Sequence, residues 1–159
     1  MDYLIWKLVH VVSVIMFVGN ITTGVFWAAH AVRSEDFALI ASTFDGIIRA
    51  DRRFTTPGVV GLTIGGIAAA ISGGLPILGT GWILWGIVLL LISGAAFGMR
   101  VAPLQREILR LAREGDAADE ARQTFRRCYA SWQFWGTVAL LTPLIAVVLM
   151  VLKPGLPGL

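Results

Sequence analysis

Residues 81–99 read GWILWGIVLLLISGAAFGM, an apolar stretch without a charged side chain. A helix of about 20 residues crosses the hydrocarbon core of a bilayer, so this stretch, continued to residue 101, predicts a membrane span. Three further apolar stretches predict spans at residues 3–32, 57–78 and 129–152. The sequence therefore predicts an all-α fold, a four-helix transmembrane bundle in a single integral membrane domain of residues 1–159.

Composition places the chain in the lipid bilayer rather than in water. Of its 159 residues, 57% are hydrophobic and 14% are charged, too few charges to cover a soluble domain. The net charge of +3 does not indicate nucleic-acid binding, because the arginines lie beside predicted spans, where membrane orientation accounts for them. The single cysteine, Cys128, excludes an internal disulfide and a metal site of several cysteines.

The loop charges predict the orientation. Arginines concentrate in residues 33–53 and 100–127, whereas the connection near Gly79 and Thr80 carries no charge. Loops rich in arginine stay in the cytoplasm, so both termini are predicted to lie outside it.

The first arginine-bearing connection is itself predicted to be helical. Ser34 is its expected N-cap, and the connection carries apolar residues at helical spacing, namely Phe37, Ile40, Ala41, Phe44, Ile47 and Ile48. This pattern predicts an interfacial amphipathic helix in the headgroup plane, between spans one and two. Thr55 or Thr56 is then expected to cap the second span, with Pro57 in its first turn.

The second arginine-bearing connection predicts a helical hairpin. The third helix is expected to continue to Glu114, with Gly115 as its C′ residue and Asp116 as the next N-cap. The fourth span contains Pro143, which should kink the helix or leave a carbonyl free near residue 139.

Glycines four residues apart mark predicted packing seams in the second and third spans. The pairs are Gly61 with Gly65 and Gly94 with Gly98. Such spacing lets helix backbones approach closely in lipid. Because these faces exceed what one small bundle needs, they also predict a homodimer.

A polar stripe runs along the first span. At 100° per residue it contains His10, Ser13, Phe17, Asn20 and Gly24. Lipid cannot satisfy a histidine or an asparagine, so the stripe should face the bundle interior. An intramembrane histidine is a candidate haem ligand, metal ligand or proton relay. The alternative is a neutral ring that is hydrogen-bonded to a helix carbonyl or to Asn20.

The other polar groups leave the ligand set open. His30 lies about 30 Å along the helix from His10, so the two cannot hold one iron within a subunit. Lys7 either reaches the aqueous interface or holds an anion, such as a haem propionate, near His10. Asp51 is a charge at the membrane edge, or pairs with Arg100 in a cluster that Gln105 and Gln133 join.

Three segments resemble a bacterial family of integral membrane proteins, the domain of unknown function 2269. They are WKLVH (residues 6–10) with FVGN (17–20), ADRRFTTP (50–57) and LMVLKP (149–154). The resemblance implies a multi-pass protein of the bacterial inner (plasma) membrane, and no activity.

A more distant likeness is to four-helix membrane protoporphyrinogen oxidases that bind haem b. It rests on a histidine in the first span, an arginine-rich hairpin and Lys153-Pro154 near the end. The likeness implies that His10 matches their haem-associated histidine. The chain departs from the pattern by lacking their arginine, near Val25, and their lysine, near Trp85.

These observations lead to one main functional prediction and two alternatives. The main one is a small membrane protein that binds haem b, with His10 as axial ligand and Lys7, Ser13, Phe17 and Asn20 near the cofactor. A redox role with quinone as partner is the further expectation. The alternatives are a transporter or channel-like protein for a small solute, proton or metal ion, and a packing subunit of a membrane complex.

Overall fold

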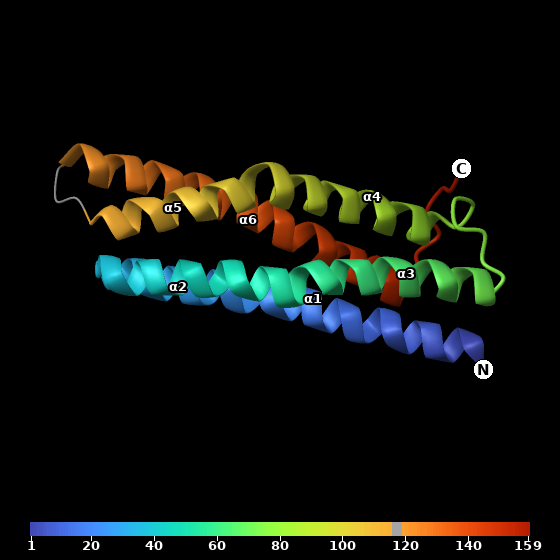
Figure 1. Cartoon of the computed structure of the whole chain (residues 1–159). Helices are drawn as coiled ribbons and strands as arrows, with labels where there is room; N and C mark the ends of the chain where they lie inside the picture. Colours follow the sequence, from blue (N-terminus) through green and yellow to red (C-terminus); the bar gives the residue numbers. More distant parts are fainter. Residues whose placement is uncertain (116–118) are drawn as a thin grey trace.

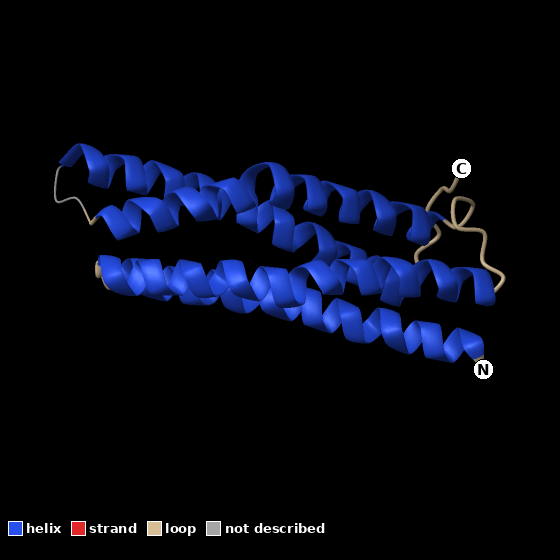
Figure 2. Cartoon of the chain, viewed as in Figure 1, coloured by secondary structure: helices blue, strands red, loops and turns tan. Residues whose placement is uncertain are grey.

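The computed structural model describes residues 1–115 and 119–159 of the chain. Long helices run side by side in an elongated bundle, with both termini at one end (Figure 1). Between the loops, the described residues are helical throughout (Figure 2). The helices are α1 (Asp2–Arg33), α2 (Phe37–Ala50), α3 (Thr56–Ser72), α4 (Gly81–Ala96), α5 (Ala102–Glu114) and α6 (Asp119–Leu152), with π-helical turns η1 (Asp51–Thr55) and η2 (Phe97–Val101).

The eight segments form four continuous rods. The turn η1 joins α2 to α3, and η2 joins α4 to α5, without a break in the helix. Together with α1 and α6 they give four helices long and apolar enough to cross a membrane, which confirms the predicted transmembrane bundle. A rod of 34 residues is about 51 Å long, more than the ~30 Å hydrocarbon core. We call the end that holds α2 and α5 the arginine-rich end.

The predicted interfacial helix is present as α2, but it does not lie in the headgroup plane. It continues the line of α3 (Figure 1), and a helix collinear with a span cannot lie flat on the membrane. Its apolar face, with Ile40, Phe44 and Ile47, is buried inside the protein. An amphipathic pattern specifies a buried stripe, whether the covering apolar surface is lipid or protein.

The predicted helix ends are correct in one case and wrong in two. Gly115 follows α5 in the left-handed conformation, with φ of 59°, as expected of a C′ glycine. The carboxylate of Asp36, and not Ser34, caps α2 by accepting the backbone N–H groups of its first turn. Neither Thr55 nor Thr56 caps a helix, because the backbone is already helical there. The expected cap at Asp116 lies outside the described residues.

A single residue separates each π-helical turn from a proline. The Thr56 N–H donates to the Asp51 carbonyl before Pro57, and the Ala102 N–H donates to the Phe97 carbonyl before Pro103. Proline has no N–H and its ring crowds the carbonyl one turn earlier, and a wider turn is one way to absorb that conflict. Such turns occur frequently at functional sites.

The described hydrophobic core lies toward the arginine-rich end. There α1, α2, α5 and α6 pack together with the C-terminal end of α4 and with η2. Toward the termini, α1 packs against α3 and α4 packs against α6. The buried core consists of Ala28, Ala31, Ile40, Phe44, Ile47, Ala96, Val101, Ile108, Ala112, Phe125, Trp132 and Ala139.

The glycine seams differ from each other. A Cβ on Gly65 would lie 2.9 Å from the backbone nitrogen of His10, and one on Gly61 would overlap the Ser13 side chain, so this pair is a packing seam as predicted. A Cβ on Gly94 or Gly98 would meet no atom within 4 Å, so within one chain that pair packs against no other helix.

Pro143 leaves a carbonyl free, as predicted. The residue four positions earlier is Ala139, whose carbonyl accepts a 2.7 Å hydrogen bond from the buried Ser93 hydroxyl of α4. The bond satisfies the carbonyl that the proline cannot, and it joins α4 to α6 inside the bundle.

Candidate functional site

The polar stripe of α1 faces the bundle interior, as the sequence predicts, and the neighbour it meets there is α3. Ser13 and Phe17 are buried. A Cβ on Gly58 of α3 would lie 3.0 Å from the Phe17 Cβ, so the two helices are in close contact there. The glycines of α3 therefore let the larger side chains of α1 sit directly on its backbone.

His10 is half-buried and hydrogen-bonded across this seam. Its Nδ1 lies 2.7 Å from the Leu62 carbonyl oxygen, which can only accept, so Nδ1 is the donor. A neutral ring then has an unprotonated Nε2, the arrangement that also prepares histidine to bind a metal. Gly66 makes room for the ring, since a Cβ there would lie 2.9 Å from Nδ1. The predicted bond to a helix carbonyl is thus present.

The structure does not bring Lys7 to His10. The Lys7 side chain is exposed, and its ammonium nitrogen lies 5.8 Å from the centre of the Tyr3 ring, one turn nearer the terminus. His30 is exposed, with its ring centroid 5.7 Å from that of Trp27. Within residues 1–115 and 119–159, no group of three or more His, Cys, Asp or Glu side chains is placed to hold a metal ion.

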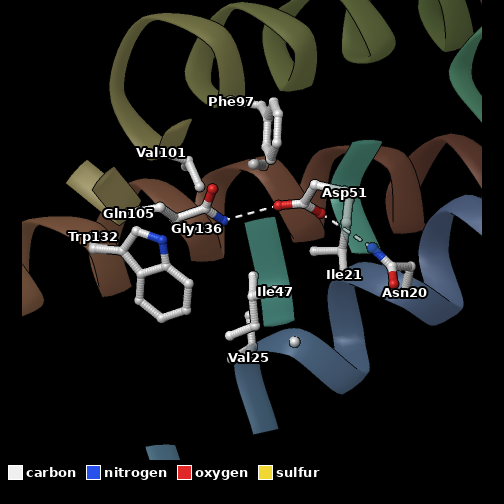
Figure 3. A pocket seen from close by; sticks show the side chains of 12 residues that line it. Asn20, Ile21, Val25, Ile47, Asp51, Phe97, Val101, Gln105, Trp132 and Gly136 are labelled. Carbon is white, nitrogen blue, oxygen red and sulfur yellow. Dashed lines mark hydrogen bonds between the residues drawn. The ribbon is translucent and has the colours of Figure 1, made fainter. Parts of the chain in front are cut away.

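The carboxylate of Asp51, a residue that is only 8% exposed, is hydrogen-bonded through both of its oxygens. Its Oδ1 accepts from Asn20 Nδ2 at 3.1 Å and from Thr55 Oγ1 at 2.8 Å. Its Oδ2 accepts from Gln105 Nε2 at 2.9 Å. Asn20 Nδ2 also approaches Thr55 Oγ1 at 2.9 Å. Figure 3 shows Asp51 between Asn20 of α1 and Gln105 of α5. We call these four residues the Asp51 cluster.

The cluster agrees only in part with the sequence prediction. Gln105 joins Asp51 as expected, but the Arg100 guanidinium lies over the Trp135 ring, 5.6 Å from its centroid. Gln133 is exposed. Among the described residues no positively charged side chain forms an ion pair with Asp51. The three donors that surround this carboxylate are therefore all neutral.

A small cavity of about 20 Å³ adjoins the cluster (Figure 3). Its walls include Asp51, Asn20, Gln105 and Trp132. Trp132 is 2% exposed, and its indole Nε1 is a buried polar atom without a hydrogen-bond partner among the described residues. A larger groove of about 310 Å³ lies beside α1 and α2, and Asn20 lines it as well.

This arrangement is suited to binding a proton or a small cation. A buried carboxylate needs its charge compensated, and neutral hydrogen bonds supply only part of the compensation. Carboxylates placed so in membrane proteins commonly mark ion and proton pathways. The sequence held one local signal, the spacing Asp51-x-x-x-Thr55 on one helical face. The partners from α1 and α5 are far away in sequence.

The comparisons with known proteins agree with this membrane architecture. Residues 4–154 match the family described as "Predicted integral membrane protein (DUF2269)". No curated protein and no solved structure matches the chain. A match over nearly the whole length shows the family, and so the chain belongs to the DUF2269 family of predicted integral membrane proteins.

Proposed function

We propose that the protein conducts protons or a small monovalent cation through the membrane, and that Asp51 binds the ion in transit. The observation that carries the proposal is a carboxylate, 8% exposed, whose three hydrogen-bond donors are all neutral. Without a cationic partner among the residues that the structure describes, the negative charge favours binding of a positive ion. This is the transporter or channel-like alternative, now with a named ion-binding group.

The position of Asp51 along its rod suits an ion entering or leaving the membrane. Ser72 lies 21 positions after Asp51 on the same rod, which is about 32 Å of helix and close to one hydrocarbon thickness. The carboxylate then lies near the membrane boundary on the arginine-rich side. The proposed location is the bacterial inner membrane, with that side in the cytoplasm and both termini outside.

The test is a proton-flux measurement in proteoliposomes with a trapped pH dye and an imposed pH gradient. The wild type should dissipate the gradient faster than protein-free vesicles. Asp51→Asn, which keeps the shape but loses the charge, should slow the protein-dependent rate by about tenfold or more. Repeating the assay with sodium or potassium gradients identifies the ion.

Asp45→Asn is the matched control. Asp45 is a carboxylate of α2, in the same rod as Asp51, but it is paired with Arg49 and Arg113 at the surface. This variant should conduct within about twofold of the wild type, because a screened surface pair contributes little. A wild-type rate equal to that of empty vesicles for all three ions, or an unaffected rate in Asp51→Asn, refutes the proposal.

A second candidate function is the binding of haem b at His10. What favours it is the Nδ1–H bond to the Leu62 carbonyl, which leaves Nε2 as the ligating nitrogen. Bound haem would supply one-electron chemistry, with quinone as a membrane-soluble partner. In a homodimer, the His10 residues of both protomers would hold the haem iron. Lys7 points toward Tyr3 and does not contribute to this fit.

Absorbance of the purified protein, with haem supplied during expression, tests this second candidate. A Soret band should appear in the wild type and in His30→Ala, and should fall by about tenfold in His10→Gln. Glutamine retains a donor for the Leu62 carbonyl, which separates loss of the ligand from loss of the fold. A wild type without the band, or a band that His10→Gln leaves intact, rejects haem binding at this residue.

A further inference from the structure

The cavity beside Asp51 has the size and the chemistry of a water site. Its volume of about 20 Å³ exceeds the ~10–15 Å³ that one water requires. Most of the cavity lining is apolar, but a carboxylate and two side-chain amides also line it, and such polar groups distinguish it from a purely apolar cavity, which would stay dry.

Trp132 supplies an independent reason for a water. Its indole N–H is buried and has no acceptor among the described residues, and such a group typically costs about 1–3 kcal/mol when left unpaired. In Figure 3 the nitrogen side of the ring is turned toward Gln105, and both residues line the cavity. A water in the cavity can accept from the indole and donate to an oxygen of the cluster.

The groove beside α1 and α2 adjoins this site. It shares Asn20, Gly24 and Ile47 with the lining of the cavity, so these three residues separate the two spaces. The groove is mostly apolar, but Thr23 and Thr43 add two hydroxyl groups to its lining. Asn20 is hydrogen-bonded to Asp51, so the amide that lines the groove also touches the carboxylate.

We propose that the groove and the cavity form one water path from the arginine-rich side of the bundle to Asp51, ending at a water held by Trp132. This water path would serve the proposed ion conduction and rests on that proposal, because an ion bound by a buried carboxylate needs a hydrated route. Hydration itself is measurable without any transport assay, so the two proposals can fail separately.

Gly46 offers a way to block the groove without disturbing the fold. It lines the groove, it is exposed, and a Cβ built on it would meet no atom within 4 Å. A leucine there therefore has space for its Cβ, and it is a better helix former than glycine. Its side chain should occupy part of the groove. Gly94→Leu is the matched control, because Gly94 is equally open but lies on α4, outside the lining of both spaces.

The experiment follows hydrogen exchange at the indole of Trp132. Protein with ¹⁵N-labelled tryptophan is placed in D₂O in detergent micelles, and the Trp132 signal is identified by its absence in Trp132→Phe. In the wild type, this buried indole should exchange within minutes. Gly46→Leu should slow its exchange by about tenfold, and Gly94→Leu should stay within about twofold of the wild type.

Two results would overturn the inference. An indole that stays protected as long as the backbone amides of the core means that water does not reach the cavity. Rapid exchange that Gly46→Leu leaves unchanged, in a variant whose circular dichroism matches the wild type, means that water arrives by another route. Neither result depends on ion flux, so a failure of the proposed function leaves this measurement valid.

Discussion

Replacing Gly65 by leucine should lower the free energy of unfolding by about 3 kcal/mol or more, the largest effect expected of any single change here. A Cβ at this position would lie 2.9 Å from the His10 nitrogen and 3.1 Å from its Cα. These are backbone atoms, so no rotamer change relieves the conflict and the helices α1 and α3 must separate. The free energy is measured by denaturant titration in mixed micelles, followed by circular dichroism.

Gly94→Leu is again the appropriate control, because Gly94 belongs to the other predicted glycine seam and faces open space. Leucine is the better helix former, so helix propensity alone favours both substitutions. The Gly94 variant should be as stable as the wild type as a monomer. Equal stabilities of the two variants would contradict the close approach of α1 and α3.

Gln105→Leu should destabilise the protein by about 1.5–3 kcal/mol, the second largest effect. The change removes the donor at 2.9 Å from Asp51 Oδ2 and leaves that oxygen buried without its partner. Leucine fits the volume of glutamine closely, so the loss reports the hydrogen bond more than packing. Unfolding titrations of Gln105→Leu and of Gln133→Leu, an exposed glutamine of α6, measure the difference.

A double-mutant cycle with Asp51→Asn assigns the effect to the carboxylate. If Gln105 acts by stabilising the charge of Asp51, its replacement should cost clearly less in the Asp51→Asn background. Equal costs in both backgrounds would mean that Gln105 stabilises the bundle independently of Asp51. Loss of stability in Gln133→Leu comparable to that in Gln105→Leu would also contradict the role of the cluster.

The architecture could be predicted from the sequence because it depends on local patterns. Uninterrupted apolar stretches give the four membrane-crossing helices, and the stripe containing His10 and Asn20 gives the face of α1 that is buried. Pro143 predicted a free carbonyl because a missing N–H acts on the residue one turn earlier, and the residue there is Ala139. In each case the cause lies within a few residues of its effect.

The candidate site was less predictable because its partners meet only in the folded bundle. The sequence suggests Gln105 as a neighbour of Asp51, but Asp51 is followed by two arginines, a pattern typical of a charge at the membrane edge, and nothing nearby indicates that Asn20 of α1 approaches it. The predicted orientation of α2, in the headgroup plane, was wrong for a related reason. An apolar stripe requires an apolar neighbour, but only the fold determines whether that neighbour is lipid or another helix.

The one-sided placement of the core has a mechanical consequence. The pair α1–α3 and the pair α4–α6 are held together mainly at the arginine-rich end. The two pairs can therefore rotate relative to each other about a hinge beside Asp51. Over an arm of about 30 Å, a rotation of roughly 10° at the hinge moves the far tips by about 5 Å. Small changes in hydrogen bonding at the hinge would thus be amplified at the opposite membrane surface.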